Sequence, residues 1–591
     1  MIKKLLSLGV LLLSFDLASA QDVDLSNKLI QEYNSYRKER SAESSLRSHR
    51  PITSSCLNSL ILDARKNWNN LTDEAKNTFR TYLSRPSYSG TEVIVTSANF
   101  DYHYTLTGAD AIPSTDADGS GYPDYIENMA AIFENCWTQY TNRNFAMPPF
   151  DGAEGGSQYY DIYVGDLGTG LYGFVSPENN IGNNPQSGTT EVSAYTSWMG
   201  MNKDYSWAPG ITETQAIQVT AAHEFFHAVQ FGTTSETTNF LAEATAAWSE
   251  DEIYPGIDDN FQYIVDVFNR PDIALNWNRN DGNSGSPYSS HWYGPWIFFR
   301  YMTEHTSTDI IRAIYGRTIS QPNDLEAINL ELTSNWNSSL RDMFEKAYIS
   351  FDVLSSTSSY APYTFSRASN YVSYLSSSCS GVCYEDGYSY AGTQLVHHSN
   401  TDGNHRLMRM SADYLDIASN QNFSVRLTKN NQNAQLDIIL LKYDFAASTV
   451  VASHSTLLGN DPIIRITDNA NYDAYTLLVE RIDRTVTDTL SEQYTITLDN
   501  ATVDVEEIPQ SDISVYPNPA SDNFMIENRS KAILSHMELK DITGKLIQSY
   551  RFESASGTQR ISASDLQSGY YIATLYFDNG AISTQKIIIQ K

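Results

Sequence analysis

Residues Thr212 to Phe231 read TETQAIQVTAAHEFFHAVQF. Apolar residues recur here at helical spacing and Gly232 follows the last aromatic residue, so the pattern predicts one long helix. His223 and His227 are four residues apart and therefore project from the same helix face, where both imidazoles can reach one metal ion. Glu224 lies beside them, where its carboxylate can take a proton from bound water.

A second predicted helix follows after a short turn, from about residue 239 to 252, and reads NFLAEATAAWSEDE. Its small residues allow the two helices to approach closely, with a Glu directed at the first helix. Zn²⁺ is the natural ion for two neutral imidazoles, because it suits nitrogen ligands and has no redox chemistry. A catalytic zinc usually has three protein ligands and one position for water, so a third ligand is required.

The two helices resemble those of the gluzincin metallopeptidases, whose third ligand is a Glu on the helix after HExxH. In that pattern the ligand is preceded by Leu-x and followed by small residues and an aromatic, which Glu243 satisfies; Glu250, two turns further on, is the alternative. Residues from about 100 to 354 are also similar to a family of secreted bacterial metalloproteases with HEFFHAVQF-like and LxExxAxWxED-like segments. The resemblance implies a zincin-like fold, bound Zn²⁺ and peptidase activity on peptide or protein substrates, with an endopeptidase expected.

The chemistry expected at such a site is hydrolysis by a metal-activated water. Zinc lowers the pKa of its water to about 7 and polarises the scissile carbonyl. Glu224 is expected to be the general base that accepts the water proton and passes it to the leaving amine. The oxyanion needs a further donor. Tyr293 and His291, which precede a helix predicted near residues 293–305, are the candidates, and a packing role explains both equally well.

Residues 116–127 read DADGSGYPDYIE and match the twelve-position loop of an EF-hand, with Gly121 at the sharp turn. The expected Ca²⁺ ligands are the backbone carbonyl of Tyr122 and the side chains of Asp116, Asp118, Ser120, Asp124 and Glu127. The preceding segment reads as strand and turn, and Pro123 has no N–H to pair with a sister loop, so one structural calcium in a strand–loop–helix is expected. The alternative is an acidic turn that caps the helix starting near Tyr125.

The charge balance excludes some partners. The chain has 591 residues, with 39 Lys plus Arg against 70 Asp plus Glu and a net charge of −31 at pH 7. Phosphates are neutralised by clustered Lys and Arg, so no nucleic-acid partner is expected. After the leader no stretch approaches about 18 uninterrupted apolar residues, so no transmembrane segment is expected in the mature chain.

Residues 1–20 read MIKKLLSLGVLLLSFDLASA and predict a signal peptide, with a basic start, a short apolar core and a small-x-small ending. Export permits disulfides, but four Cys residues are too few for a disulfide scaffold. Cys379 and Cys383 can close a small ring, which would leave Cys56 and Cys136 as a second pair, and three connectivities are open. Cys56 capping the metal in a proform is a further alternative.

The predicted elements divide the mature chain into four parts. Residues 21–90 form an N-terminal helical segment, with helices over Leu57 to Trp68 and from Thr72, and this segment is either structural or a pro-segment that blocks the cleft. Residues 91–368 form the zincin-like catalytic domain with the calcium loop. It contains expected strands at 92–96, 100–104 and 159–164 and expected helices near 309–315 and 339–354.

After about residue 370 short β-prone stretches replace the helical pattern, as at 423–427 and 434–441. Residues 369–508 are therefore predicted to form a β-sandwich accessory domain. Residues 511–591 contain YPNP at 516–519, DITGK at 541–545, LQSGYY at 566–571 and KIII at 586–589. This order resembles the C-terminal sorting domain of type IX secretion cargo. The resemblance implies the secretion machinery as a partner, export across an outer membrane, removal of the domain, and release or attachment at the cell surface.

These features predict a multidomain α+β protein: a zincin-like metalloprotease domain, an all-β sandwich and a small C-terminal β-sandwich sorting domain. The expected function is that of a secreted zinc metallopeptidase stabilised by calcium. The alternative is a catalytically silent zincin scaffold that acts in surface binding or adhesion through its β-sandwich. The presence of His223, Glu224, His227 and Glu243 together favours the enzyme.

Overall fold

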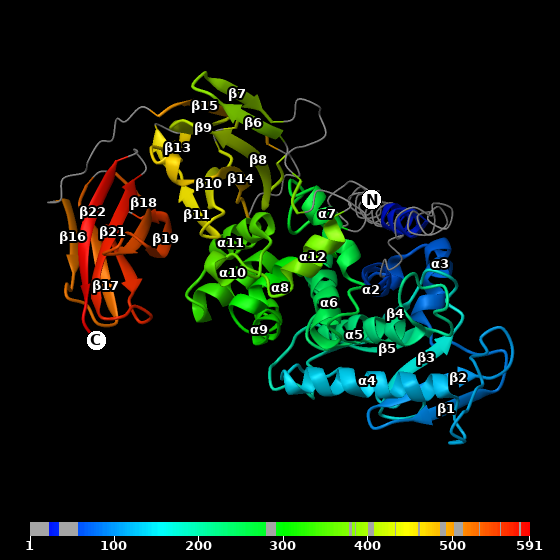
Figure 1. The fold of residues 1–591 in the computed structure, drawn as a ribbon. Coiled ribbons are helices and arrows are strands. Elements are labelled where there is room, and N and C mark those ends of the chain that lie inside the picture. The colour runs from blue at the N-terminus through cyan, green and yellow to red at the C-terminus, as the bar shows by residue number, and fades with distance from the viewer. Residues whose placement is uncertain are drawn as a thin grey trace, which may run out of the picture. The chain divides into compact units, whose positions relative to one another are not determined.

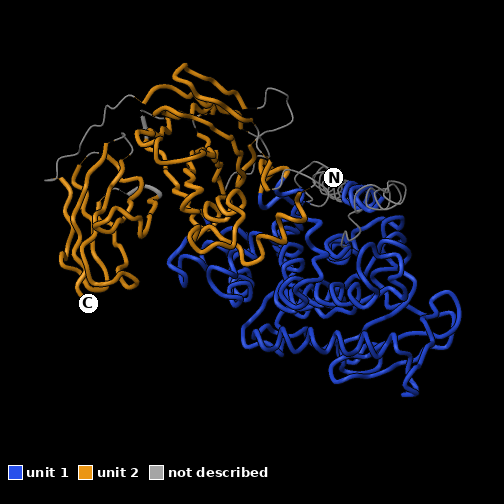
Figure 2. The backbone as a smooth tube through the Cα atoms, in the orientation of Figure 1, with its two compact units in different colours: residues 1–268, 275–340 blue, residues 269–274, 341–591 orange. Residues whose placement is uncertain are grey.

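The computed structural model describes residues 23–34, 57–278, 291–376, 381–383, 386–399, 407–431, 433–458, 461–484, 492–501, 512–530, 532–555, 557–577 and 581–591. The predicted signal peptide lies outside these residues. The chain forms two compact units, residues 1–268 with 275–340 and residues 269–274 with 341–591 (Figure 2). Residues 341–368, assigned above to the catalytic domain, therefore group with the β-rich unit. No helix in the described ranges has the length and apolar character needed to cross a membrane.

A five-stranded mixed sheet is the frame of the first unit (Figure 1). Its strands are β1 (Glu92–Thr96), β2 (Phe100–Thr105), β3 (Tyr160–Gly165), β4 (Gly173–Gly182) and β5 (Ala194–Asn202). Their order across the sheet is β1-β2-β3-β5-β4, in which β2, β3 and β5 run parallel while β1 and β4 are antiparallel edge strands. Every residue of β2 and β5 is buried, because helices pack on both faces of the sheet.

The two faces of the sheet are covered by different helices. Phe225 of α5 lies 5.1 Å from Phe100 of β2 and 5.6 Å from Tyr160 of β3, ring centre to ring centre. Tyr163 is three positions further along β3 and so faces the opposite side, where it shares a core with α2 and α3. Besides a helix over residues 23–34, the α-helices described in this unit are α2 (Asn58–Lys66), α3 (Asp73–Leu83), α4 (Asp124–Asn142), α5 (Glu213–Phe231), α6 (Asn239–Ile253), α7 (Phe261–Asn269), α8 (Trp296–His305), α9 (Asp309–Thr318) and α10 (Asp324–Asn335).

Local signals in the sequence explain where α5 begins. Its N-cap is Thr212, whose hydroxyl accepts a hydrogen bond from the backbone N–H of Gln215. In return, the side-chain carbonyl of Gln215 accepts a hydrogen bond from the backbone N–H of Thr212. This capping box satisfies N–H groups that the first helical turn leaves unpaired. The helix therefore starts within one residue of its predicted start, which places His223 and His227 on consecutive turns of a buried helix.

The second unit contains a β-sandwich. Its sheets have the orders β11-β10-β14-β8-β6 and β12-β13-β9-β15-β7, and their facing side chains share one apolar core. Its elements are α11 (Leu340–Val353), α12 (Ala368–Leu375), β6 (Asp386–Tyr390), β7 (Leu395–His398), β8 (Ser411–Ser419), β9 (Phe423–Lys429), β10 (Leu436–Asp444), β11 (Thr449–His454), β12 (Thr456–Leu458), β13 (Asp461–Ile466), β14 (Ala474–Arg481) and β15 (Tyr494–Asn500). The predicted strands at 423–427 and 434–441 are confirmed.

The C-terminal residues of this unit form a smaller two-sheet β-structure with a core of its own. One sheet has the order β16-β17-β20 and the other β19-β18-β21-β22. The strands are β16 (Ile513–Tyr516), β17 (Asn523–Asn528), β18 (Leu534–Asp541), β19 (Leu546–Ala555), β20 (Gly557–Ser562), β21 (Gly569–Phe577) and β22 (Ile582–Ile589).

The cysteines correct one expectation. Cys136 is a free thiol in the buried face of α4, with its sulfur 3.9 Å from the hydroxyl of Tyr254, so the pair Cys56–Cys136 is wrong. Burial raises the pKa of the Cys136 thiol to about 12, so it stays protonated. Cys383 is disulfide-bonded. Cys56 and Cys379 lie outside the described residues.

Candidate metal centre

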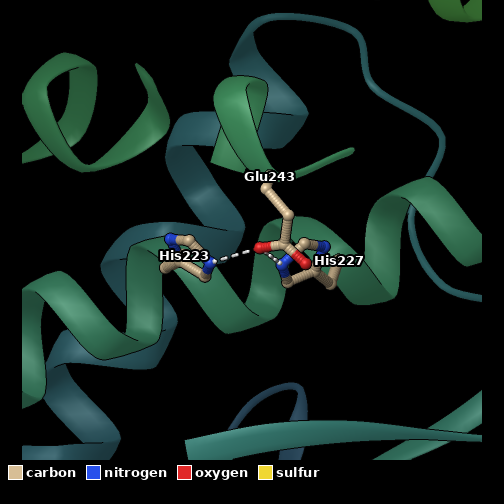
Figure 3. Close-up of side chains that lie close together, drawn as sticks. All are labelled: His223, His227 and Glu243. Atoms are coloured by element: carbon tan, nitrogen blue, oxygen red, sulfur yellow. Dashed lines mark hydrogen bonds and ion pairs between the residues drawn. The ribbon is translucent and has the colours of Figure 1, made fainter. Parts of the chain in front are cut away.

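Two helices bring His223, His227 and Glu243 together (Figure 3). His223 and His227 come from α5, and Glu243 from the first turns of the neighbouring helix α6. The Nε2 atoms of both histidines lie 3.3 Å from the same oxygen, Oε2 of Glu243. All three side chains are buried, with 7%, 1% and 1% of their surface exposed for His223, His227 and Glu243.

These distances can be tested against the geometry that zinc requires. Zinc–nitrogen and zinc–oxygen bonds of about 2.0–2.1 Å in a tetrahedron place neighbouring ligand atoms about 3.3 Å apart. The distance of 3.3 Å from each Nε2 to the Glu243 oxygen therefore fits a tetrahedral ion held by all three residues.

The other nitrogen of each imidazole is held by a separate acceptor. Nδ1 of His223 lies 2.7 Å from Oε1 of Glu250, and Nδ1 of His227 lies 2.8 Å from Oε1 of Gln230. Gln230 is itself fixed by donating to the Ala242 carbonyl of α6 at 2.9 Å. A partner that accepts from Nδ1 leaves the Nε2 lone pair free for a metal. Glu250, the alternative ligand, thus lies on the far side of the His223 ring from Glu243.

Burial and charge perturb these groups strongly. Burial by itself would lower the pKa of His223, but its hydrogen bonds with Glu243 and Glu250 outweigh this and raise it to about 10. Burial would raise the pKa of Glu243, but the two histidines lower it to about 2. Burial raises the pKa of Glu250 to about 7. Such clusters of perturbed groups are typical of functional sites.

The predicted base, Glu224, follows His223 on α5 and is 4% exposed. Its Oε2 accepts a hydrogen bond of 2.8 Å from the side-chain amide of Asn58, on helix α2. The carbonyl of the same amide accepts from the backbone N–H of Val175, in edge strand β4, also at 2.8 Å. One residue of the N-terminal segment therefore covers the predicted base and occupies the edge of the sheet.

A cavity beside the candidate metal ligands is lined by residues of the same helix, α2. A cavity of about 220 Å³ adjoins His227 and Glu243 and is walled on one side by Ser59, Leu62 and Lys66 of α2. Lys66 closes its rim by donating to the Ser235 carbonyl at 2.7 Å. Helix α2 therefore forms one wall of the cavity beside two members of the triad His223, His227 and Glu243.

Tyr293 is the candidate oxyanion donor that the structure brings to the ligands. Its ring centre lies 6.1 Å from that of His223, and it stacks on Tyr263 at 4.7 Å. Both Tyr293 and the other candidate, His291, precede α8 and are buried, with 0% and 2% exposed.

The predicted calcium loop connects the strand part of the first unit to α4, as a strand–loop–helix. Carboxylate oxygens of Asp116, Asp118 and Asp124 lie within 4.8 Å of one another. The Ser120 hydroxyl lies 3.4 Å from the Tyr122 carbonyl oxygen. Glu127 lies in the first turn of α4 and is not part of the carboxylate group. Positive φ angles of 75° and 95° at Gly119 and Gly121 allow the chain to wrap around this group.

Two residues that are not among the predicted site residues lie beside this group, Gln230 next to His227 and Asn58 next to Glu224. The spacing of Gln230 could have indicated its position, because it is three residues after His227 and so shares its helix face. No local pattern could have indicated the position of Asn58, because 166 residues separate it from Glu224.

Comparison with known families identifies the C-terminal domain. Residues 514–590 match the model of a secretion system C-terminal sorting domain. The chain is thus marked for export by the type IX machinery to the cell surface or the medium, as the motifs of this domain predicted. Curated proteins provide no match to this chain.

Solved structures give only weak similarities. The full extracellular region of zebrafish Gpr126/Adgrg6 has 13% identity and a TM-score of 0.13, and the match covers 34% of this chain and 31% of that one. The Endo-D glycoside hydrolase domain from Streptococcus pneumoniae has 14% identity and a TM-score of 0.12, covering 30% of each chain. A beta-1,2-glucanase from Parabacteroides distasonis has 13% identity and a TM-score of 0.11, covering 34% and 37%. The chain spans about a third of each solved protein, and such TM-scores carry no argument about fold or function.

Proposed function

We propose that this protein is a secreted zinc-dependent metallopeptidase with a zincin-like catalytic domain. The observation that carries the proposal is the convergence of His223, His227 and Glu243, with both Nε2 atoms 3.3 Å from one carboxylate oxygen. The His₂Glu donor set is one that catalytic zinc uses, and it leaves one position for water. Glu224 follows the first proposed ligand directly on α5 and is the proposed base for that water.

The chain's own residues have distinct roles in this proposal. Zinc held by His223, His227 and Glu243 would supply a polarised water of lowered pKa and a Lewis acid for the scissile carbonyl. Glu224 would accept a proton from the attacking water and deliver it to the leaving amine. Tyr293 is the proposed donor to the oxyanion, and Glu250 and Gln230 are proposed to orient the imidazoles through their Nδ1 atoms. The buried setting strengthens each of these interactions.

The acidic loop of Asp116, Asp118 and Asp124 is proposed to hold one structural Ca²⁺. Oxygen ligands on a tight loop suit a hard cation of this size. The loop leads directly into α4, which packs on α5, so an ion there would stabilise the helix that supports the metal ligands.

A catalytically silent scaffold that binds partners through the β-sandwich is the second candidate. The observation in its favour is the low exposure of the triad, 1–7%. A latent enzyme would have an equally buried triad. The presence of Glu224 and of all three proposed ligands favours a latent enzyme over a silent scaffold.

Hydrolysis of a denatured protein mixture, read by mass spectrometry in zinc and calcium, tests the proposal. The exported chain and a form cut between α3 and β1 are compared, each with a Glu224→Gln control that should keep the metal and lose the base. Cleavage that disappears in the control supports the peptidase and gives its specificity. Stoichiometric zinc without cleavage in either form favours the silent scaffold, and absence of zinc at the triad removes the enzyme proposal.

A further inference from the structure

A second group of buried metal-ligand side chains lies in the other compact unit. Ligand atoms of His454, His536 and Glu538 lie within 4.8 Å of one another. His454 ends strand β11 of the sandwich, while His536 and Glu538 are two residues apart on β18 and so share one face of that strand. Met537 and Leu539, which alternate with them, point into the core of the sorting domain.

The side chains of this group are buried although they face outward from their own domain. His536 and Glu538 are only 2% and 8% exposed. Nε2 of His536 and Nδ1 of His454 are buried nitrogens with no hydrogen-bond partner among the described residues. A buried polar atom without a partner costs about 1–3 kcal/mol, so two in one group call for an occupant that satisfies both.

Each side chain of the group is fixed by an outer partner. Nε2 of His454 is 2.5 Å from Oε1 of Glu345, which leaves Nδ1 as its remaining ligand atom. The ring of His536 stacks on Tyr576 of β21 at 4.1 Å and 2°. The Tyr576 hydroxyl donates to Oε2 of Glu538 at 3.1 Å, and Lys540 lies 2.8 Å from the same oxygen. Carboxylates and hydroxyls that orient ligands in this way are characteristic of metal sites.

We propose that His454, His536 and Glu538 form a second transition-metal site, with Zn²⁺ as the preferred ion, that fastens the sorting domain to the β-sandwich. Two imidazoles and one carboxylate suit zinc and are too poor in oxygen for calcium. The site would be structural, and each domain would supply part of the ligand set. It does not depend on the proposed peptidase activity.

Zinc counting in the full exported chain tests this site. The chain is loaded with zinc in excess calcium, freed of unbound metal and analysed by elemental mass spectrometry. The decisive background is His223→Ala with His227→Ala, which removes the first site. That chain should keep about one equivalent of zinc, and adding His536→Ala should remove it. His398→Ala, an exposed histidine on β7, is the matched control and should change nothing.

A second variant, Glu538→Gln, tests the site even if His536→Ala does not fold. Glu538→Gln keeps the shape of the side chain and should weaken zinc binding about 10–100-fold with an unchanged circular dichroism spectrum. Cobalt in the same background should give the absorption bands of a low-symmetry site that His536→Ala abolishes. If the background chain binds no zinc, or if His536→Ala and Glu538→Gln both leave zinc binding unchanged, the proposal is overturned and the group holds water only.

Discussion

Single buried carboxylates in this chain differ in protonation because their partners differ. Glu243 faces two histidines and has a pKa of about 2, although burial opposes its ionisation. Asp324 is also buried, and burial raises its pKa from 3.8 to about 7, because the uncharged N–H and hydroxyl of Thr238, its hydrogen-bond partners among the described residues, do not offset the burial. Its other oxygen, Oδ1, has no hydrogen-bond partner among the described residues. The acid form of Asp324 is therefore favoured by folding.

Asp324→Asn should stabilise the first unit, and more so at higher pH. In the folded protein the pKa of Asp324 is about 7, above its ordinary value of 3.8 in the unfolded chain, so wild-type stability is lost as pH rises from 3.8 to 7. Asparagine keeps an acceptor for Thr238 and does not ionise. Melting temperatures measured between pH 4 and pH 8 should show an advantage of the variant that grows with pH. The exposed Asp309→Asn is the control, and a pH-independent difference would contradict this account.

Gln230→Ala should weaken zinc binding at the triad about 10–100-fold, because His227 would lose the acceptor that orients its ring. Gln218→Ala, on the same helix, is the control. The zinc affinities of both variants are measured by competition with a chelator. Both variants also carry His536→Ala, so that only the triad binds zinc. Equal affinities of the two variants would show that Gln230 does not position His227.

At the scale of elements, α2 acts on the sheet edge as well as on the core. Its Asn58 accepts from the Val175 amide at 2.8 Å, and its Arg65 donates to the Pro177 carbonyl at 2.9 Å. Residues 175 and 177 are two apart, so these groups point the same way along the unpaired edge of β4. An extended peptide adding to that edge would need the same groups. The helix thus occupies the place of a strand beside the predicted base.

Cutting the chain in the exposed stretch around Ser87 and Ser89 and releasing the N-terminal segment should therefore increase peptide hydrolysis. The reason is that Glu224 and the edge of β4 become accessible together. Activity of cut and intact chains is compared, with a cut Glu224→Gln chain as control. A cut chain that loses its segment but gains no activity, while keeping zinc, would assign α2 a purely structural role.

Asn58→Ala offers a readout that does not require activity. It should speed hydrogen exchange of the Val175 amide about 10–100-fold, because that N–H would open to water. Asn70→Ala, outside the site, is the control. Unchanged exchange would mean that another group protects this edge.

At the scale of the whole molecule, the proposed metal site and the sorting domain lie in separate cores. His223, His227 and Glu243 lie in the first unit, and the sorting domain has a core of its own in the second. The residues that direct export and those of the proposed hydrolytic site therefore lie in different parts of the chain. The sorting domain can be deleted without removing a residue of the triad, and the triad can be mutated without changing the sorting domain.

Deletion of residues 511–591 should prevent export while leaving zinc binding at the triad intact. The sorting domain is the part that matches the secretion family, and the triad draws no residue from it. The fraction of protein outside the cells, measured by immunoblot in a bacterium with a type IX system, should fall to background. Normal export of the shortened chain would contradict the assignment of this domain.

The elements that the sequence predicted well are those whose signals are local. The four-residue spacing of His223 and His227 and the capping box at Thr212 depend only on helix geometry. The short β-prone runs at residues 92–96 and 100–104 predicted strands β1 and β2 to within one residue of their observed ends. Strands β4 and β5 were not predicted, because their places in the sheet depend on pairing with distant segments.

The sequence by itself determined the pair of histidines, the neighbouring Glu224 that is the proposed base, the acidic loop and the sorting domain, since each is encoded within about a dozen adjacent residues or in ordered short motifs. Only the tertiary structure decided that Glu243 faces both imidazoles while Glu250 lies behind His223. It alone brought Asn58 to Glu224, across 166 residues, and His454 to His536. The physical reason is that helix and strand periodicity specify which side chains share a face, whereas packing between elements selects the partners of that face.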